Sequence, residues 1–400
     1  MGKQNNTATA KTSRKNGKPK FDIKVLTPII LSFFVSGMVG TAGLVTNNVQ
    51  NNFGLSDSSA SLLASAIYVW FLVIPIPTGY IMNSLGHKKT VLLALSLSII
   101  SLIFPILHYS YLTMIISLSI LGIANTILQI SLNLLVSDVT EKKQMSSMLT
   151  LGQFVGQIPA MIIPLLAMWS VALFGSWHWV YPLFLIISIA ITFYLYKTEI
   201  KETEDKDPSS FKDLIGLFKN RIVLFCFLAI ICQVGVDVGT SITTPKIIMG
   251  RTGVSSDAAN FVTSVYAMVR LAGCLLGAYL LANFSNRKIY IASIALLILG
   301  SLGLIFFSTV GLLYLSTAAM GLGISNLFAI IFSQALESKP KRKNDISSLM
   351  IMGLVGGAIF PPLMGSANKI FGSGQQYGAI IVMLTCIAFM GYMAKIIKDE

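Results

Sequence analysis

Two charged residues stand alone inside long apolar stretches of the sequence. Asp237 lies in the segment CQVGVDVGTS, and Arg270 lies in the next apolar stretch. A charge near the centre of a bilayer costs about 3 kcal/mol or more, so an acid or base at such a position is expected to have a function. In one interpretation the two charges form an ion pair, because pairing neutralises both at the least cost. In the other, Asp237 is a coupling site that binds a proton or a cation, since burial disfavours its carboxylate form and Arg270 favours it as the chain changes conformation.

Amide side chains recur every four residues on two other apolar stretches. Asn125, Gln129 and Asn133 form one series, and Gln153 and Gln157 form the other. A spacing of four places each series on one face of a helix. A single amide could serve only to hydrogen-bond a neighbouring helix, but two stripes of amides are not expected to face lipid. The sequence therefore predicts that the two stripes form the wall of a polar cavity.

The residue types in this predicted cavity suit a sugar-like solute. Amides donate to and accept from hydroxyl groups, and an aromatic face can stack on the apolar side of a sugar ring. Trp70 and Tyr68 of the second span could supply that face, although a packing or lipid-facing role is also open for both. Asn326 and Gln233 are weaker candidates from the second half of the chain.

The sequence offers little for catalysis or metal binding. It has three His residues, and its loops hold no cluster of His, Cys and carboxylates, so we expect no metal and no cofactor. A membrane enzyme or sensor would need a nucleophile with a base, a metal cluster or a sizeable soluble domain, and it is disfavoured. The cysteines are expected to pack inside apolar stretches: Cys226, Cys232, Cys274 and Cys386.

The composition requires that these residues be positioned inside a membrane. Of 400 residues, 54% are hydrophobic and 11% are charged, whereas soluble domains carry about 25% charged residues. Mean hydropathy is +0.76. The formal net charge of +13 would suggest a nucleic-acid partner in a soluble protein, but the basic residues fall in short loops beside apolar stretches. We therefore expect a lipid bilayer, and no nucleic acid, around this chain.

Twelve apolar stretches are long enough to cross about 30 Å of hydrocarbon as helices. The predicted spans are 25–47, 59–82, 90–108, 111–136, 146–171, 177–197, 221–247, 258–283, 288–308, 310–335, 345–367 and 376–396. Basic residues gather in every even-numbered connection, which predicts that both termini are cytoplasmic. The basic, polar segment 1–24 is expected to be a disordered cytoplasmic tail.

The two halves of the sequence resemble each other. LGIAN at 121–125 matches LGISN at 322–326, and SSML at 146–149 matches SSLM at 347–350, both at an offset of 201 residues. Such a repeat predicts a duplicated six-helix bundle. The expected fold is an all-α membrane protein with 12 transmembrane helices in two pseudo-symmetric bundles, 25–197 and 221–396, joined by a cytoplasmic linker at 198–220.

One loop resembles a motif of the major facilitator superfamily. The motif, between spans two and three, reads Gly, three residues, Asp, Arg, one residue, Gly and then basic residues; here the loop is GYIMNSLGHKK. The matching positions are Gly79, Gly86, Lys88 and Lys89. Asn83 and Ser84 replace the acidic and arginine positions. The charge relay that braces the cytoplasmic gate in relatives is therefore expected to be weak or differently built.

A more specific likeness is to the fucose/galactose/glucose proton symporter family. The segments IMGLVGGAIFPPLMG, LVIPIPTGY and QISLN carry it, and it extends from about Phe53 to Met393. The resemblance implies a monomeric sugar carrier of a bacterial cytoplasmic (inner) membrane, driven by a proton gradient. Gln129 and Gln153 match the family's sugar-contacting positions.

The chain departs from this family where protons and fucose are handled. Relatives carry an Asn-Asp pair late in span one, where this chain has Thr41, Ala42 and Gly43, and an acid in span four, where Gln129 stands. Fucose itself and the family's coupling sites are therefore not carried over. The sequence predicts secondary active uptake of a monosaccharide or related solute, coupled to a proton gradient. Three alternatives stay open: facilitated diffusion, cation coupling, and drug or lipid efflux on the same fold.

Overall fold

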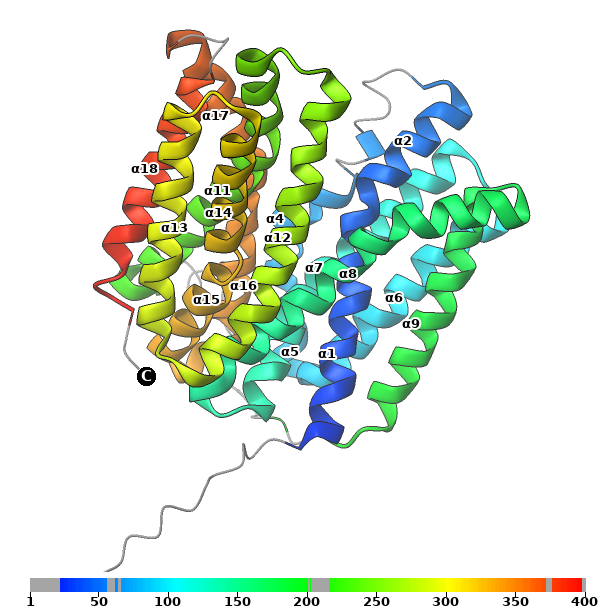
Figure 1. Ribbon diagram of the computed structural model, residues 1–400. Coiled ribbons are helices and arrows are strands. Elements are labelled where there is room, and N and C mark those ends of the chain that lie inside the picture. Colours follow the sequence, from blue (N-terminus) through cyan, green and yellow to red (C-terminus); the bar gives the residue numbers. More distant parts are fainter. Residues whose placement is uncertain are drawn as a thin grey trace, which may run out of the picture.

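The computed structural model describes residues 22–55, 62–63, 66–200, 202, 216–371 and 376–397, and these residues form helices joined by short connections (Figure 1). Most of the predicted tail at 1–24 and of the predicted linker at 198–220 lies outside the described residues. The described ranges contain no β-strand. The predicted all-α fold is confirmed.

The first half of the chain contains these helices: α1 Ile23–Gly37, η1 Met38–Thr41, α2 Ala42–Phe53, α4 Trp70–Val73, α5 Pro75–Leu85, α6 His87–Leu107, α7 Tyr111–Val139, α8 Lys142–Phe174, η2 Trp177–Trp179 and α9 Val180–Lys197. Local sequence sets several of the ends. Ser110 and Thr113 form a reciprocal capping box at the start of α7. Gly175 ends α8 with φ of 73°, a conformation that glycine adopts without strain.

The second half contains these helices: η3 Leu217–Lys219, α11 Arg221–Thr252, α12 Ser256–Asn283, α13 Asn286–Phe306, α14 Val310–Ile324, α15 Leu327–Ser338, η4 Pro340–Arg342, α16 Lys343–Met352, η5 Gly353–Val355, α17 Gly356–Phe371 and α18 Tyr377–Met393. Within the described residues, ten helical segments are long and apolar enough to cross a membrane. The pair Ala66–Val73 and Pro75–Leu85 makes an eleventh if it is one span. The 17-residue α18 occupies the place of the predicted twelfth span.

Several predicted spans are interrupted near their middle. The second span bends by 62° between Val73 and Pro75, where proline removes a backbone donor. The tenth is divided at Ser325 and Asn326, and the eleventh passes through the short helix η5. Irregular backbone is tolerated at membrane depth only where protein or a cavity surrounds it. These breaks therefore indicate interior positions rather than lipid-facing ones.

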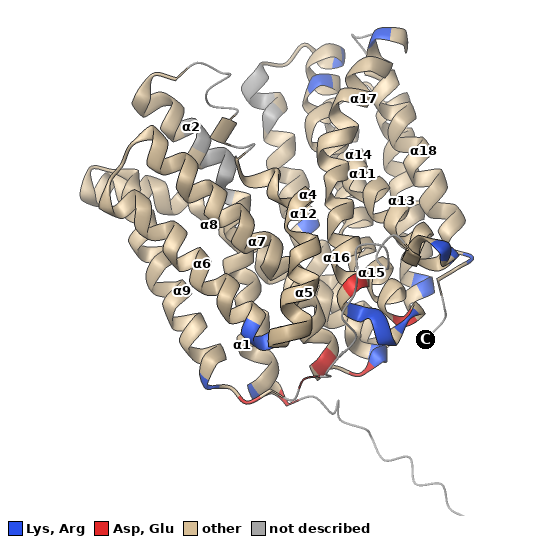
Figure 2. Ribbon diagram, turned by 180° about the vertical axis from the view of Figure 1, so that it is seen from behind, with Lys and Arg blue, Asp and Glu red and all other residues tan. Residues whose placement is uncertain are grey.

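The two halves of the chain lie side by side, α1 to α9 on one side and α11 to α18 on the other (Figure 1). They meet where α8 packs on α12 and α15, and where α5 and α7 pack on α16. The described chain starts and ends at the same end of the bundle (Figure 1). Most of the Lys and Arg positions lie at that end (Figure 2), which we call the basic end; it includes Lys88, Lys89, Lys142, Lys143 and Lys288.

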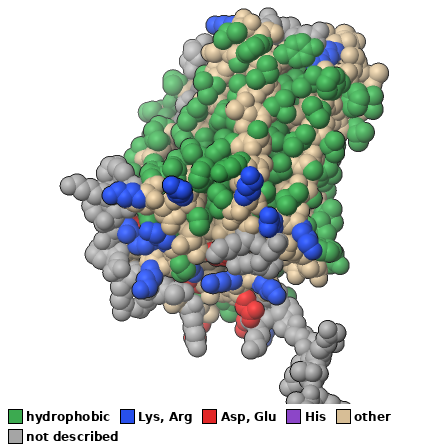
Figure 3. Space-filling model, turned by 90° about the vertical axis from the view of Figure 1, so that its left-hand side faces the viewer, with side chains coloured by type: hydrophobic (Ala, Val, Ile, Leu, Met, Phe, Trp, Pro, Cys, Tyr) green, Lys and Arg blue, Asp and Glu red, His purple; other side chains and the backbone are tan. Residues whose placement is uncertain are grey.

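Apolar side chains cover the outer face above the basic end (Figure 3). Leu299 and Phe306 of α13 are 63% and 74% exposed, and Leu315 of α14 is 64% exposed. Large exposed apolar surfaces are rare on soluble monomers. The surface therefore suits a hydrocarbon environment, in agreement with the predicted membrane class.

Candidate functional site

A cavity of about 640 Å³ lies between the two halves. Both halves contribute to it, which is the arrangement that the sequence repeat predicts for a carrier. Its volume is typical of small-molecule sites. The lining residues are Tyr68, Phe71, Gln129, Gln153, Gln157, Gln233, Val234, Asp237, Val238, Arg270, Phe328, Leu354, Val355, Gly357 and Ala358.

Glutamines from three helices reach this cavity. Gln129 comes from α7, Gln153 and Gln157 come from α8, and Gln233 comes from α11. On α8, Gly152 and Gly156 lie against α1, where an added Cβ at Gly152 would be 2.8 Å from the ring of Phe33. Because this glycine face packs on α1, the neighbouring glutamines are free to turn toward the cavity. Each glutamine offers two N–H donors and one carbonyl acceptor.

Asp237 and Arg270 form an ion pair at the cavity wall. Arg270 Nη1 lies 2.9 Å from Asp237 Oδ2, and the two side chains are 27% and 14% exposed. The hydroxyl of Tyr266 donates to Asp237 Oδ1 at 2.6 Å. The sequence predicted a functional role for the two charged residues, but it led to no prediction for Tyr266. Its position four residues before Arg270, on the same face of α12, is the signal that could have found it.

An aromatic wall is present, but Trp70 is not part of the cavity lining. Tyr68 and Phe71 line the cavity from the second span, with ring centroids 6.3 Å apart, and Phe328 lines it from α15. The Nε1 of Trp70 is buried and has no hydrogen-bond partner among the described residues. Tyr68 and Phe71 are three residues apart and therefore lie on one face of the second span, whereas Trp70 lies on another face.

Three of the predicted amides lie outside the cavity lining. Asn125 accepts a hydrogen bond from Ser36 Oγ at 2.8 Å and so joins α7 to α1. Asn326, the first residue before α15, packs against Gly277 of α12. Asn133 is fully buried, and neither of its amide atoms has a partner among the described residues. In this conformation, these residues belong to helix packing rather than to the cavity wall.

The repeated serine pairs cross between the halves toward the basic end. Ser146 Oγ lies 2.6 Å from Ser333 Oγ, and Ser147 Oγ donates to the carbonyl of Ala278 at 2.5 Å. In the second copy of the repeat, Ser347 Oγ donates to the carbonyl of Ile130 at 3.0 Å. We call these contacts the serine seam. They hold the two halves together below the cavity.

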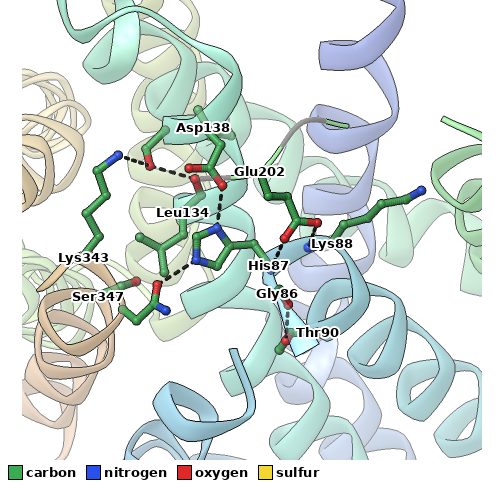
Figure 4. Close-up of polar contacts among 12 residues, drawn as sticks. Gly86, His87, Lys88, Thr90, Leu134, Asp138, Glu202, Lys343 and Ser347 are labelled. Carbon is green, nitrogen blue, oxygen red and sulfur yellow. Dashed lines mark hydrogen bonds and ion pairs between the residues drawn. The ribbon is translucent and has the colours of Figure 1, made fainter. Parts of the chain in front are cut away.

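The loop GYIMNSLGHKK also joins the two halves, through the side chain of His87. The sequence led to no prediction for this residue. Gly86 turns the chain into α6 with φ of 83°. His87 Nδ1 lies 2.5 Å from Asp138 Oδ2 of α7, and Nε2 lies 2.7 Å from Asn344 Oδ1 of α16 (Figure 4). The braced loop is therefore differently built from the motif it resembles, as predicted. His87 directly follows Gly86, where the motif has its first basic residue.

The predicted gating residues of this loop have distinct surroundings. Gly79 lies against the second half, since an added Cβ would be 3.2 Å from Ser348 Oγ. Lys88 Nζ donates to the carbonyl of Tyr196 at 3.1 Å, within the first half. Lys89 is exposed. Of these four residues, Gly79 is therefore the one placed against the second half, whereas Gly86 lies against Glu202 of the linker.

Comparison with known families gives one match that spans the chain. The family model described as Major Facilitator Superfamily matches residues 29–361 and 225–399. A glucose/galactose transporter of Brucella abortus biovar 1 (strain 9-941) is 24% identical over 394 residues, covering 92% of this chain and 94% of that protein. Protein TsgA of Escherichia coli O157:H7 is 23% identical over 272 residues, covering 67% of this chain and 68% of that protein.

Solved structures share the fold at low sequence identity. FucP, described as a Major Facilitator Superfamily transporter in the outward conformation, superposes with a TM-score of 0.79 at 19% identity, covering 94% of this chain and 99% of that chain. The proton:xylose symporter XylE gives a TM-score of 0.71 at 14% identity, covering 94% and 96%. The shared fold includes both halves of the chain.

Proposed function

We propose that this chain, which belongs to the Major Facilitator Superfamily, takes up a monosaccharide or a related small polar solute. Uptake proceeds by alternating access and is coupled to protons. The observation that carries the proposal is the cavity between the halves. Its glutamines come from α7, α8 and α11, and its wall holds one ion pair. The repeated bundles can rock around such a central cavity and expose it to one side at a time.

The cavity chemistry favours a sugar. Hydroxyl groups taken out of water must be hydrogen-bonded, and the four glutamines provide both donors and acceptors. The apolar side of a pyranose ring can stack on the rings of Tyr68, Phe71 or Phe328, which also line the cavity. The name of the Brucella relative, a glucose/galactose transporter, supports the same solute class.

We assign the basic end to the cytoplasm. The excess of Lys and Arg there follows the positive-inside rule, which places both termini in the cytoplasm. The resemblance to the proton symporter family further supports a monomer in a bacterial inner membrane. The serine seam then closes the cavity toward the cytoplasm. The described conformation is accordingly outward-facing, the state in which a solute would bind from outside.

Coupling is assigned to Asp237, the one carboxylate among the described residues that line the cavity. A proton bound by Asp237 would release Arg270 from the ion pair, and Arg270 could then hydrogen-bond the solute. A second candidate, facilitated diffusion, is favoured by the same geometry. Arg270 and Tyr266 already engage both carboxylate oxygens of Asp237, so the pair can also stay intact throughout transport.

Ligand-induced thermal stabilisation tests the solute class. A ligand that binds only the folded protein raises its unfolding temperature. We expect at least one neutral hexose, at saturating concentration, to raise the unfolding temperature of the detergent-purified chain by about 3 °C or more. Lipophilic cations and lipid-like drugs are expected to have no comparable effect. Stabilisation by these compounds, and by no sugar, would instead support the efflux alternative.

Two glutamines of the same helix provide the matched variants. Gln153→Leu removes a cavity amide and should weaken hexose binding about tenfold or more, because a sugar hydroxyl is left unpaired. Gln144→Leu makes the same change on α8 away from the cavity lining and should bind like the unmodified chain. Equal binding by the two variants would remove Gln153 from the solute site.

A further inference from the structure

His87 lies at the cytoplasmic end of the protein, where side-chain contacts join the first half to the second half. Its side chain belongs to the first turn of α6 and is 3% exposed. On one side it meets Asp138 at the end of α7, and on the other it meets Asn344 in α16 (Figure 4). No other His of the described residues joins the two halves. The imidazole is thus part of the gate and remote from the solute cavity.

The hydrogen-bond pattern determines the protonation state that fits this place. Asn344 Nδ2 donates to Asn83 Oδ1 at 2.5 Å, so Asn344 presents its carbonyl oxygen to the imidazole. Asp138 presents a carboxylate oxygen to the other ring nitrogen. Both ring nitrogens therefore face acceptors. A neutral imidazole has one N–H donor, whereas the imidazolium ion has two and satisfies both contacts.

The charges around His87 favour the same state. The side chain of Asp138 is fully buried and forms the nearest charge. Glu202 lies at the start of α6, where its carboxylate accepts from the backbone N–H groups of His87 and Lys88 at 2.6 and 2.9 Å. Arg342, the last residue of η4, pairs with Asp345 of α16, and Lys343 Nζ of α16 lies 3.5 Å from Ser137 Oγ. The two carboxylates in contact with His87, those of Asp138 and Glu202, therefore favour the positively charged imidazolium.

We propose that His87 is a proton-binding latch of the cytoplasmic gate. With its proton, His87 donates to Asp138 and Asn344 and holds α6 against α16, so the gate is closed. When the proton leaves to the cytoplasm, one of the two donors is lost, and either the contact within the first half or the contact between halves breaks. The bond that breaks is one ring N–H, whose proton passes to cytoplasmic water while the electron pair stays on the ring nitrogen; Asp138 remains a carboxylate.

The latch can respond to pH because residue 87 is a histidine. An arginine at this place would keep its charge at every pH that a cell experiences, so its contacts would be permanent. An imidazole changes charge near neutral pH. A rise in cytoplasmic pH is therefore expected to favour the inward-open state of this protein. The inference rests on the proposed alternating access, but it depends neither on the identity of the solute nor on coupling through Asp237.

Distance measurements between spin labels across the gate test the latch. Labels at Lys142→Cys in α8 and Lys288→Cys in α13 would report from exposed positions at the basic end of the two halves. The purified full chain is reconstituted without solute, and its distance distribution is measured between about pH 6 and about pH 9. The unmodified chain, labelled in parallel, shows the background from native cysteines.

Three variants in this labelled chain give distinct expected results. With His87 present, the ratio of the population at the short distance to the population at the long distance should fall about tenfold as the pH rises. This change corresponds to loss of one charged hydrogen bond. His87→Arg should keep the short distance at every pH, and His87→Gln should favour the long distance at every pH. His108→Gln, which changes an exposed histidine at the opposite end of α6, should titrate like the parent.

Two results would overturn the proposal. One is a distance distribution that does not depend on pH in the parent chain. The other is a pH response that persists in His87→Arg, which would assign the titration to another group such as Asp237. Because the distances are read without solute, a protein that carried no sugar would still give a clear result for the latch.

Discussion

Replacing Arg270 with Met is expected to lower solute uptake about a hundredfold or more. The change leaves Asp237 at the cavity wall with Tyr266 as its remaining hydrogen-bond donor among the described residues. Breaking a buried ion pair by removing one partner costs about 3–5 kcal/mol, because the other charge stays buried and uncompensated. Uptake into proteoliposomes, normalised to the amount of reconstituted protein, measures the loss.

A second change on the same pair separates folding from function. The double variant Asp237→Asn/Arg270→Met leaves no uncompensated charge at this position of the cavity wall, so its unfolding temperature should return toward that of the parent while its uptake stays low. Arg287→Met, at an exposed position of α13, serves as the matched arginine control. Full uptake by Arg270→Met would show that the ion pair has no part in binding or coupling.

Joining the halves covalently at the serine seam is expected to abolish transport. The Oγ atoms of Ser146 in α8 and Ser333 in α15 are 2.6 Å apart, so sulfur atoms at the same positions can approach the bonding distance of about 2.05 Å. In the double variant Ser146→Cys/Ser333→Cys, oxidation would hold the cytoplasmic side closed. Uptake should then fall to the level of protein-free liposomes and return after reduction.

The single variants Ser146→Cys and Ser333→Cys control for the four native cysteines. Each should keep its uptake under the same oxidising conditions, and mass spectrometry of the oxidised double variant should show the cross-link. Unchanged transport by a fully cross-linked protein would contradict the assignment of this contact to a gate. It would mean that the two halves do not separate there during the transport cycle.

The amide stripes show how far the sequence specified the site. Their four-residue spacing predicted which helix face is polar, and Gln129, Gln153 and Gln157 do line the cavity. Asn125 and Asn133 lie on the same stripe, yet one bonds α1 and the other is buried. Helical periodicity predicts the face of the helix on which a side chain lies. It does not predict where along the helix two neighbouring helices diverge to leave a cavity. That position is set by packing between distant parts of the chain.

Residues that act through tertiary contacts were missed for the same reason. Tyr266 is one of several tyrosines in apolar stretches; its spacing from Arg270 places it on the same helix face, but its bond to Asp237 is a contact with another helix. His87 bonds Asn344, which is 257 positions away in the sequence. The breaks at Pro75 and Asn326 also depend on context, because a break inside a span is stable only when surrounding protein satisfies the freed backbone groups. By contrast, the helical spans follow directly from composition, since a bilayer demands long apolar helices.

Accumulation of a labelled hexose tests the central claim most directly. Purified protein in proteoliposomes is given radiolabelled glucose, galactose, fucose or an amino sugar, with and without an imposed pH gradient that is acidic outside. We predict that at least one of these sugars enters, accumulates above its external concentration only with the gradient, and is excluded by the cross-linked serine variant. Equal, non-accumulating uptake under both conditions would support facilitated diffusion instead. If no sugar of the panel enters in either condition, the proposed function is contradicted.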